Sequence, residues 1–196
     1  LMQNTEVDIK KYDTYFITPN YDNNFSKNYF EKIEKILDYG VKILQFRSKN
    51  LSEEQYCIVA KKIYKLCQKY NSFFIVNDLN NFNRNKYCNG IHLTSKNLLH
   101  GNISKIPSNY IIIGSCHNIE EIEICNRFKL KFIVISPVLD SGNKIGIGWR
   151  NFKKLADNSN VPVFALGGMN YKRDINTVKS LGGIGIASIS YFYKLF

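Results

Sequence analysis

The sequence predicts an α/β fold in which eight short strands alternate with helices. Short apolar runs recur along the chain, helical patterns separate most of them, and Gly, Pro or polar residues mark the boundaries. Eight strands in 196 residues fit a single-domain (β/α)₈ TIM barrel better than a doubly wound sheet, which usually carries a Gly-rich turn after its first strand. We expect the barrel to span residues 14–196 and residues 1–13 to be a lead-in or a linker remnant.

The predicted strands cover residues 14–19, 41–49, 72–78, 90–95, 110–117, 132–136, 161–168 and 183–190. After the first strand, apolar residues repeat at helical spacing until Gly40. Ser52 and Gln55 form a capping box for the second helix, and the third strand is followed by about one helical turn. The first three strands and the helical segments that follow them therefore predict three successive strand-helix units.

The later helices carry their own boundary signals. Asn118 and Glu121 form an Asx-led variant of the capping box, and residues 149–157 form the next helix. Asn170 caps the helix after the seventh strand, and Gly182 stands where a C-terminal cap needs positive φ. These signals continue the same alternation to the end of the chain.

Composition narrows the functional classes. The chain is 44% hydrophobic and 14% aromatic, which suits one sizeable core. Its net charge of +11 is spread over the polar faces of several helical patterns, so we expect no nucleic-acid partner and, at most, attraction for phosphorylated small molecules.

Targeting and redox signals are few. No apolar run approaches the roughly 18 residues of a membrane span, and the first residues lack the apolar centre of a signal peptide. We therefore expect a cytoplasmic protein without a membrane partner. The five Cys form no CxxC pair and are interpreted as reduced, mostly buried thiols.

Polar residues gather where the predicted strands end. Arg47 and Lys49 are either ordinary loop residues or, beside Asn77 and Asp78, a clamp for a diphosphate. Asp78 either starts a turn or is a Mg²⁺ ligand, since hard cations take carboxylate oxygens. In a barrel these strand ends converge on one mouth, which predicts an anion-binding site.

Two histidines and two glycines add to this mouth. His92, between Ile91 and Leu93, is interpreted as a packed, hydrogen-bonded side chain, whereas His117 is as well explained by function as by structure. Residues 167–168 are glycines followed by a capped helix, and they offer backbone N–H groups to a phosphate. Phosphate sites after strands seven and eight are common in barrels.

Seven motifs in order resemble the thiamine-phosphate synthase family, which includes thiazole tautomerases. They are LQFRSK, IVND, NGIHL, GSCH, SPVLDSGNK, ALGGM and IASIS. The resemblance implies a transferase that joins a pyrimidine methyl diphosphate to a thiazole phosphate with loss of diphosphate. Metal and cations would stabilise the leaving group, with Mg²⁺ as the cofactor.

The resemblance also implies residue roles. A pyrimidine and diphosphate site is matched by Gln45, Arg47 and Lys49, and an amide followed by the first metal carboxylate is matched by Asn77 and Asp78. The hydroxyl-rich loops over the two phosphate groups are matched by Ser115, Ser141, Asn143 and Lys144, with Asn143 in place of a usual threonine. The backbone phosphate cradle is matched by Gly168, Ile189 and Ser190.

The segment after the fourth strand departs from the family. Synthases read HLGQ followed by two acidic positions, whereas this chain reads HLTSKN, with Lys96 and Asn97 at those positions. Because a cation opposes a neighbouring metal ion, we expect Mg²⁺ to bind the free protein weakly or not at all.

Several motifs resemble more closely the synthase-like domain fused behind Nudix hydrolases. Three functions therefore stay open: the transferase, a cofactor-free thiazole tautomerase in which His117 moves the proton, and a non-catalytic phosphate-binding domain with a Nudix hydrolase partner. The sequence also leaves a homodimer open.

Overall fold

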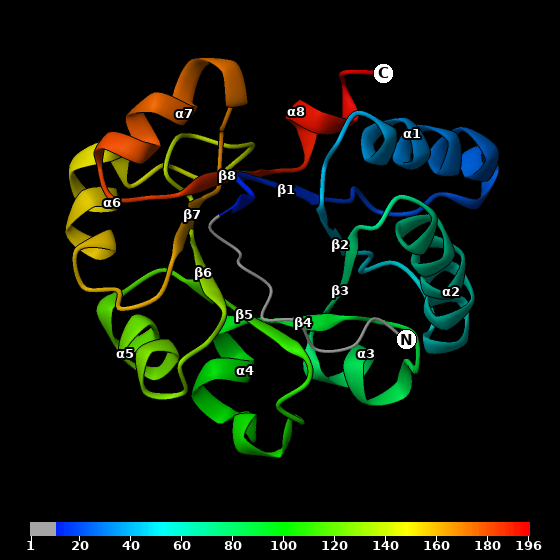
Figure 1. Ribbon diagram of the computed structural model, residues 1–196, viewed down its shortest axis with the longest axis horizontal. Helices are drawn as coiled ribbons and strands as arrows, with labels where there is room; N and C mark the ends of the chain where they lie inside the picture. The colour runs from blue at the N-terminus through cyan, green and yellow to red at the C-terminus, as the bar shows by residue number, and fades with distance from the viewer. Residues whose placement is uncertain (1–10) are drawn as a thin grey trace.

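A computed structural model describes residues 11–196, in which eight parallel strands close into a barrel (Figure 1). Strands that are consecutive in sequence are neighbours, and β1 pairs with β8 to close the ring. The strands are β1 (Thr14–Ile17), β2 (Ile43–Phe46), β3 (Phe73–Asn77), β4 (Gly90–Leu93), β5 (Ile111–Cys116), β6 (Phe132–Ile135), β7 (Val163–Ala165) and β8 (Gly185–Ser188). The predicted (β/α)₈ barrel is confirmed.

The helices surround the strands on the outside of the ring (Figure 1). They are α1 (Ser26–Asp38), α2 (Glu53–Lys69), α3 (Leu79–Arg84), α4 (Ser95–His100), α5 (Ile119–Arg127), α6 (Gly148–Ala156), α7 (Tyr171–Ser180) and α8 (Ser190–Tyr193), with 3₁₀ turns η2 (Asn23–Phe25) and η3 (Ile103–Lys105). Neither α4 nor the short α8 is predicted from the sequence. Phe192 of α8 packs edge-on against Phe16 of β1.

Most predicted helix caps form. The capping box of α2 has both of its hydrogen bonds, from Gln55 N to Ser52 Oγ at 3.3 Å and from Ser52 N to Gln55 Oε1 at 3.2 Å. Gly182 has a φ of +93° at the end of α7. Only one of the two hydrogen bonds of the capping box expected at α5 forms, from Glu121 N to Asn118 Oδ1. The Glu121 carboxylate accepts from the backbone N–H of His117 instead of from that of the N-cap residue Asn118.

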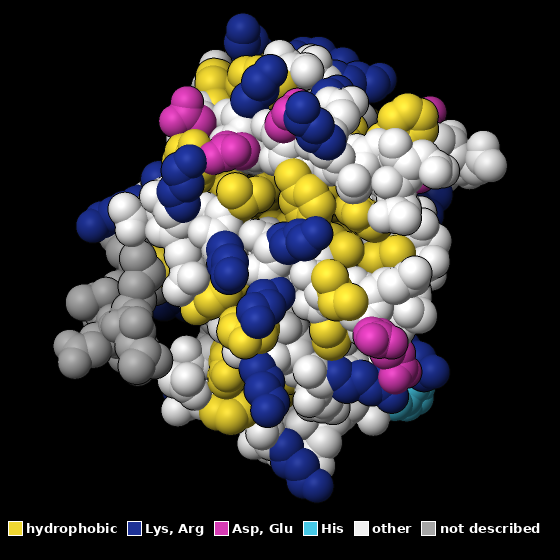
Figure 2. All heavy atoms as spheres, turned by 90° about the vertical axis from the view of Figure 1, so that its right-hand side faces the viewer, with side chains coloured by type: hydrophobic (Ala, Val, Ile, Leu, Met, Phe, Trp, Pro, Cys, Tyr) yellow, Lys and Arg dark blue, Asp and Glu magenta, His cyan; other side chains and the backbone are white. Residues whose placement is uncertain are grey.

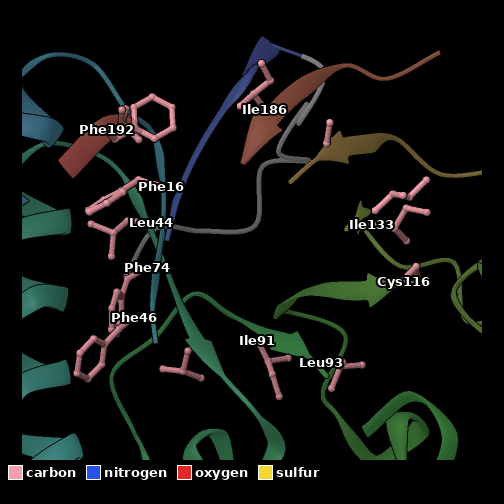
Figure 3. Close-up of a cluster of buried hydrophobic side chains, with 14 of the residues drawn as sticks. Phe16, Leu44, Phe46, Phe74, Ile91, Leu93, Cys116, Ile133, Ile186 and Phe192 are labelled. Atoms are coloured by element: carbon pink, nitrogen blue, oxygen red, sulfur yellow. The ribbon is translucent and has the colours of Figure 1, made fainter. Parts of the chain in front are cut away.

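Side chains alternate between the inside of the barrel and the layer between strands and helices. Tyr15 and Ile17 belong to an inner apolar cluster, whereas Phe16 between them belongs to the outer one. Figure 3 shows members of the outer cluster, including Phe46 and Phe74, along the strands that face α1 and α2. This alternation fills both layers with apolar residues and leaves the strand ends to polar ones.

The predicted lead-in lies mostly outside the described residues, since the structure describes the chain from residue 11 onward. Tyr12 packs against Phe73 at a centroid separation of 6.1 Å. Asp13 accepts from Tyr171 Oη at 2.9 Å and from Lys179 Nζ at 2.8 Å, and its carbonyl accepts from Ile186 N at 2.9 Å. Contacts with the barrel therefore begin just before β1.

Positively charged side chains are interspersed with other residues on one face of the molecule. On the face that carries α1 and α2, Lys and Arg side chains are separated by apolar, acidic and other residues (Figure 2). Within residues 11–196, none of the helices has the length and apolarity needed to cross a membrane.

Candidate functional site

A cavity of about 600 Å³ opens where the strands end, and every strand or its following loop contributes to its wall. The lining residues are Ile17, Gln45, Arg47, Lys49, Asn77, His92, Thr94, Ser95, Lys96, Ser115, His117, Ser136, Pro137, Ser141, Asn143, Lys144, Leu166, Gly167 and Ile189. Four of them are cations and none is Asp or Glu. The cavity therefore suits a small anionic ligand.

The structure brings together all but three of the site residues that the sequence singled out. The exceptions are Asp78, Gly168 and Ser190, which lie outside the lining of this cavity. Gly168 borders a second, shallower depression with Arg173, and Ser190 borders a third one with Asn170.

Four hydrogen-bonded side chains, Tyr15, Gln45, Asn77 and His92, form what we call the floor of the cavity. Gln45 is fully buried, and its Nε2 donates to Tyr15 Oη at 2.7 Å and lies 2.8 Å from His92 Nδ1. Asn77 Nδ2 donates to Gln45 Oε1 at 3.0 Å, and Tyr15 Oη lies 2.9 Å from His92 Nδ1. Each polar group of the floor is thereby held in one orientation.

His92 is neutral in this network. Burial, together with the nearby charges of Arg47 and His117, lowers its pKa to about 3. Because Nδ1 faces the donors Gln45 Nε2 and Tyr15 Oη, Nδ1 is the acceptor and the proton belongs on Nε2. The interpretation of His92 as a packed, hydrogen-bonded histidine is confirmed, and its ring also lines the cavity.

His117 sits beside a buried carboxylate. Its Nδ1 lies 3.1 Å from Glu121 Oε2 and 3.0 Å from Ser95 Oγ, and its Nε2 lies 3.5 Å from Ser136 Oγ. Burial acts to raise the pKa of Glu121, but hydrogen bonds from His117 and Ser95 outweigh it and lower that pKa. The carboxylate fixes the imidazole so that one ring nitrogen remains on the cavity side.

The remaining charges surround the mouth, and we call Arg47, Lys49, Lys96 and Lys144 the rim cations. Arg47 and Lys49 follow β2, Lys96 lies at the start of α4 after β4, and Lys144 follows β6. Within residues 11–196, none of the four forms an ion pair with a carboxylate. Burial lowers the pKa of Arg47, yet a guanidinium stays charged at neutral pH.

A tight turn carries Lys144. Ser141 N donates to Lys144 O at 3.0 Å, Lys144 N donates back at 3.1 Å, and Gly142 between them has a φ of +59°. The paired backbone fixes the start of the side chain, while the amine stays in solvent.

The glycine pair after β7 has a packing reason of its own. Gly167 and Gly168 have φ values of +101° and +64°. A Cβ on Gly167 would lie 2.7 Å from Pro137 Cα, and one on Gly168 would lie 2.5 Å from the Asp140 carbonyl oxygen. The glycines let the β7 loop contact the β6 loop, so their presence does not by itself require a phosphate.

Comparison with known proteins identifies the family. The sequence model of the family described as "Thiamine monophosphate synthase" matches residues 14–192. The chain belongs to this family. Its membership and its curated relatives identify it as a thiamine-phosphate-synthase-like transferase.

Individual relatives agree with this family. The chain is 28% identical to thiamine-phosphate synthase of Fusobacterium nucleatum, covering 94% of this chain and 90% of that one. It is 36% identical to thiamine-phosphate synthase of Prochlorococcus marinus over 84% of this chain. The matched region is about half (48%) of that longer protein. The barrel matches thiamine phosphate pyrophosphorylase from Pyrococcus furiosus with a TM-score of 0.75 at 24% identity, over 92% and 87% of the two chains.

Members of the family generally use Mg²⁺, but the residues present here suit this ion poorly. Asp78 begins α3 as its N-cap, and its Oδ1 accepts from Asn80 N at 2.9 Å. Asn97 is buried, and its Oδ1 accepts from Leu79 N and Thr94 N, both at 3.2 Å. Within residues 11–196, no three His, Cys, Asp or Glu side chains are grouped as metal ligands. Oxygen ligands for a hard cation are therefore few.

Two contributions were missed at the level of sequence. The capping pattern accounts for Glu121, although its spacing of four residues from His117, just before α5, is also that of a helical side-chain pair. Tyr15 is one residue of an apolar strand, and its hydroxyl meets His92 only because the closed ring turns β1 and β4 toward the same interior.

Proposed function

We propose that this family member joins a pyrimidine methyl diphosphate to a thiazole phosphate and releases diphosphate. The carbon–oxygen bond to the diphosphate breaks, and a bond from the same carbon to the thiazole forms. The observation that carries the proposal is the cavity itself, in which four cations and no carboxylate surround a buried amide and imidazole floor.

The rim cations serve the leaving group. Arg47, Lys49 and Lys144 stabilise the negative charge that develops on the diphosphate as the carbon–oxygen bond breaks. Charges fixed before the reaction need little reorganisation, which makes such stabilisation effective. Gln45 and Asn77 bind the pyrimidine through the floor, where their orientation is already set.

The thiazole phosphate is assigned to the part of the mouth formed by β5 and by the segments that follow β6 and β8. Ser115, Ser141, Asn143 and Ile189 line the cavity there, while Gly168 and Ser190 border adjoining depressions. Asp78 is the carboxylate that would meet Mg²⁺ if diphosphate carried the ion in with its own oxygens, but diphosphate binding is not proposed to depend on that ion. Binding of Mg²⁺ to the free protein is proposed to be weak or absent.

The test is product formation from both phosphorylated precursors. Arg47→Ala should lower kcat/KM by about 100-fold or more, which is about 2.7 kcal/mol of transition-state stabilisation. Lys153→Ala is the matched control, because Lys153 pairs with Asp157 on the outer surface of α6 at 2.9 Å. Failure of the wild type to form product under any metal condition would contradict the proposal.

A second function has one observation in its favour. His117 is held by the buried Glu121 at 3.1 Å, as a proton-transferring imidazole would be. In a thiazole tautomerase, turnover of a thiazole phosphate alone would persist in EDTA and would fall steeply in His117→Ala. The transferase predicts instead that His117→Ala retains most activity with both precursors.

A purely binding role would be recognised by the absence of turnover. A non-catalytic domain that serves a Nudix hydrolase would gain thermal stability with phosphorylated ligands and form no product. A homodimer and a cytoplasmic location also stay predictions, to be tested by light scattering and by fractionation of cells.

A further inference from the structure

We propose that Lys96 takes over the role of a metal ion at the mouth, so that the cavity binds diphosphate without Mg²⁺. The proposal rests on the proposed function only for the identity of the anion. Lys96 lines the cavity, is solvent-exposed, and lies in the first turn of α4, whose N-cap Thr94 and first residue Ser95 also line the wall.

The distribution of charge supports this role. The rim cations follow β2, β4 and β6, which are alternate strands of the closed ring. They therefore approach a ligand from three separate segments of the chain and not from one side. Because the lining of the cavity has no carboxylate, these like charges raise one another's energy until an anion enters between them.

The start of α4 holds the backbone of Lys96 in place. Thr94 Oγ1 accepts from Asn97 N at 3.3 Å, and Asn97 Oδ1 accepts from Thr94 N at 3.2 Å, so the capping box fixes the backbone on both sides of Lys96. Ser95 Oγ lies 3.0 Å from His117 Nδ1. The lysine thus starts from a fixed point on the wall of the cavity.

Hydrogen bonds also engage Asn97 and Asp78, the two residues whose side-chain oxygens would otherwise hold a metal. The amide oxygen of Asn97 is used twice, for Thr94 N and for Leu79 N. Asp78, at the start of α3, uses one carboxylate oxygen for Asn80 N. A lysine ammonium supplies one positive charge to phosphate oxygens and needs no ligands from the protein.

The experiment measures inorganic pyrophosphate binding by calorimetry, in EDTA and in millimolar Mg²⁺. The wild type should bind in EDTA, and Mg²⁺ should change the Kd by less than about threefold. Lys96→Ala should weaken binding in EDTA by about tenfold, and Lys96→Arg should retain it. Lys96→Glu should bind appreciably only when Mg²⁺ is present.

Lys105→Ala, on the exposed η3 turn outside the cavity, is the matched control and should leave the Kd unchanged. Unfolding curves of all variants check that the fold is retained. Pyrophosphate binding by the wild type only with Mg²⁺, or unchanged binding by Lys96→Ala in EDTA, would overturn the proposal. Metal-free pyrophosphate binding without product formation would instead reject the transferase reaction and still support the role of Lys96.

Discussion

The floor and the rim of the cavity are built in opposite ways. On the floor, the polar side chains are buried or half-buried, and they hydrogen-bond to one another, as Gln45 does with Tyr15, Asn77 and His92. At the rim, Lys49, Lys96 and Lys144 are exposed. The floor is therefore organised before any ligand arrives, whereas the rim obtains its partner from the ligand.

Substitutions in the floor and in the rim should therefore affect the free energy of unfolding differently. A change on the floor leaves a buried polar group without its partner, so it costs folding free energy as well as binding. A change at the rim removes repulsion between like charges, so it costs binding alone. Three variants test this contrast.

Gln45→Leu should have the largest effect. Leucine fills much of the volume but removes the bonds to Tyr15, Asn77 and His92, and buried groups left without partners cost about 1–3 kcal/mol each. We expect the free energy of unfolding in urea to fall by about 2–4 kcal/mol. Gln68→Leu, at an exposed position of α2, should change it by less than about 0.5 kcal/mol. Equal losses in the two variants would show that the floor has no special cost.

The stability of the protein should depend on pH through His92. In the folded chain the pKa of His92 is lowered to about 3, from about 6.5 in the unfolded chain. Between about pH 6.5 and pH 3, His92 is therefore protonated in the unfolded chain and neutral in the folded one. The stability contributed by neutral His92 is complete above about pH 6.5 and is lost as the pH falls. The loss should reach about 2–3 kcal/mol by about pH 4.5.

His92→Gln should remove this component. The difference in unfolding free energy between wild type and variant, measured in urea from about pH 7 to about pH 4.5, isolates it because acidic groups contribute alike to both proteins. His100→Gln, an exposed position at the end of α4, serves as the control. A difference that stays constant with pH would mean that folding does not shift the pKa of His92.

Lys144→Ala should have the smallest effect and should separate the two regions most clearly. We expect about tenfold weaker pyrophosphate binding, or about 1.4 kcal/mol, which diminishes with added salt. The free energy of unfolding should stay within about 0.5 kcal/mol of the wild type, since Lys144 is exposed. Lys154→Ala on α6 is the control for binding. A stability loss comparable to that of Gln45→Leu would remove the distinction between rim and floor.

The barrel was predictable because its signals are local. Apolar runs, helix caps such as Ser52 with Gln55, and the positive φ expected at Gly182 each depend on neighbouring residues. The convergence of Arg47 and Lys144 also follows from sequence, since parallel strands bring their carboxyl ends to one face.

The remaining features depend on contacts between distant segments. His92 meets Tyr15 across 77 residues, and no periodicity encodes the register that joins them. Asp78 is a plausible ligand in sequence, but the α3 backbone takes one of its oxygens. Gly168 fits a phosphate cradle equally well by sequence, yet the close approach of Asp140 also explains it.

The pairing of β1 with β8 ties the first strand to the last one. During synthesis, the edge of β1 must remain without its partner until Gly185–Ser188 has left the ribosome, while β2, β3 and β4 can already pair in order. Unpaired strand edges are sites of association between chains, and pairings between distant segments form slowly. The vulnerable period for aggregation therefore lasts until β8 is made, and a nascent chain arrested before β8 should bind chaperones more strongly than the complete barrel.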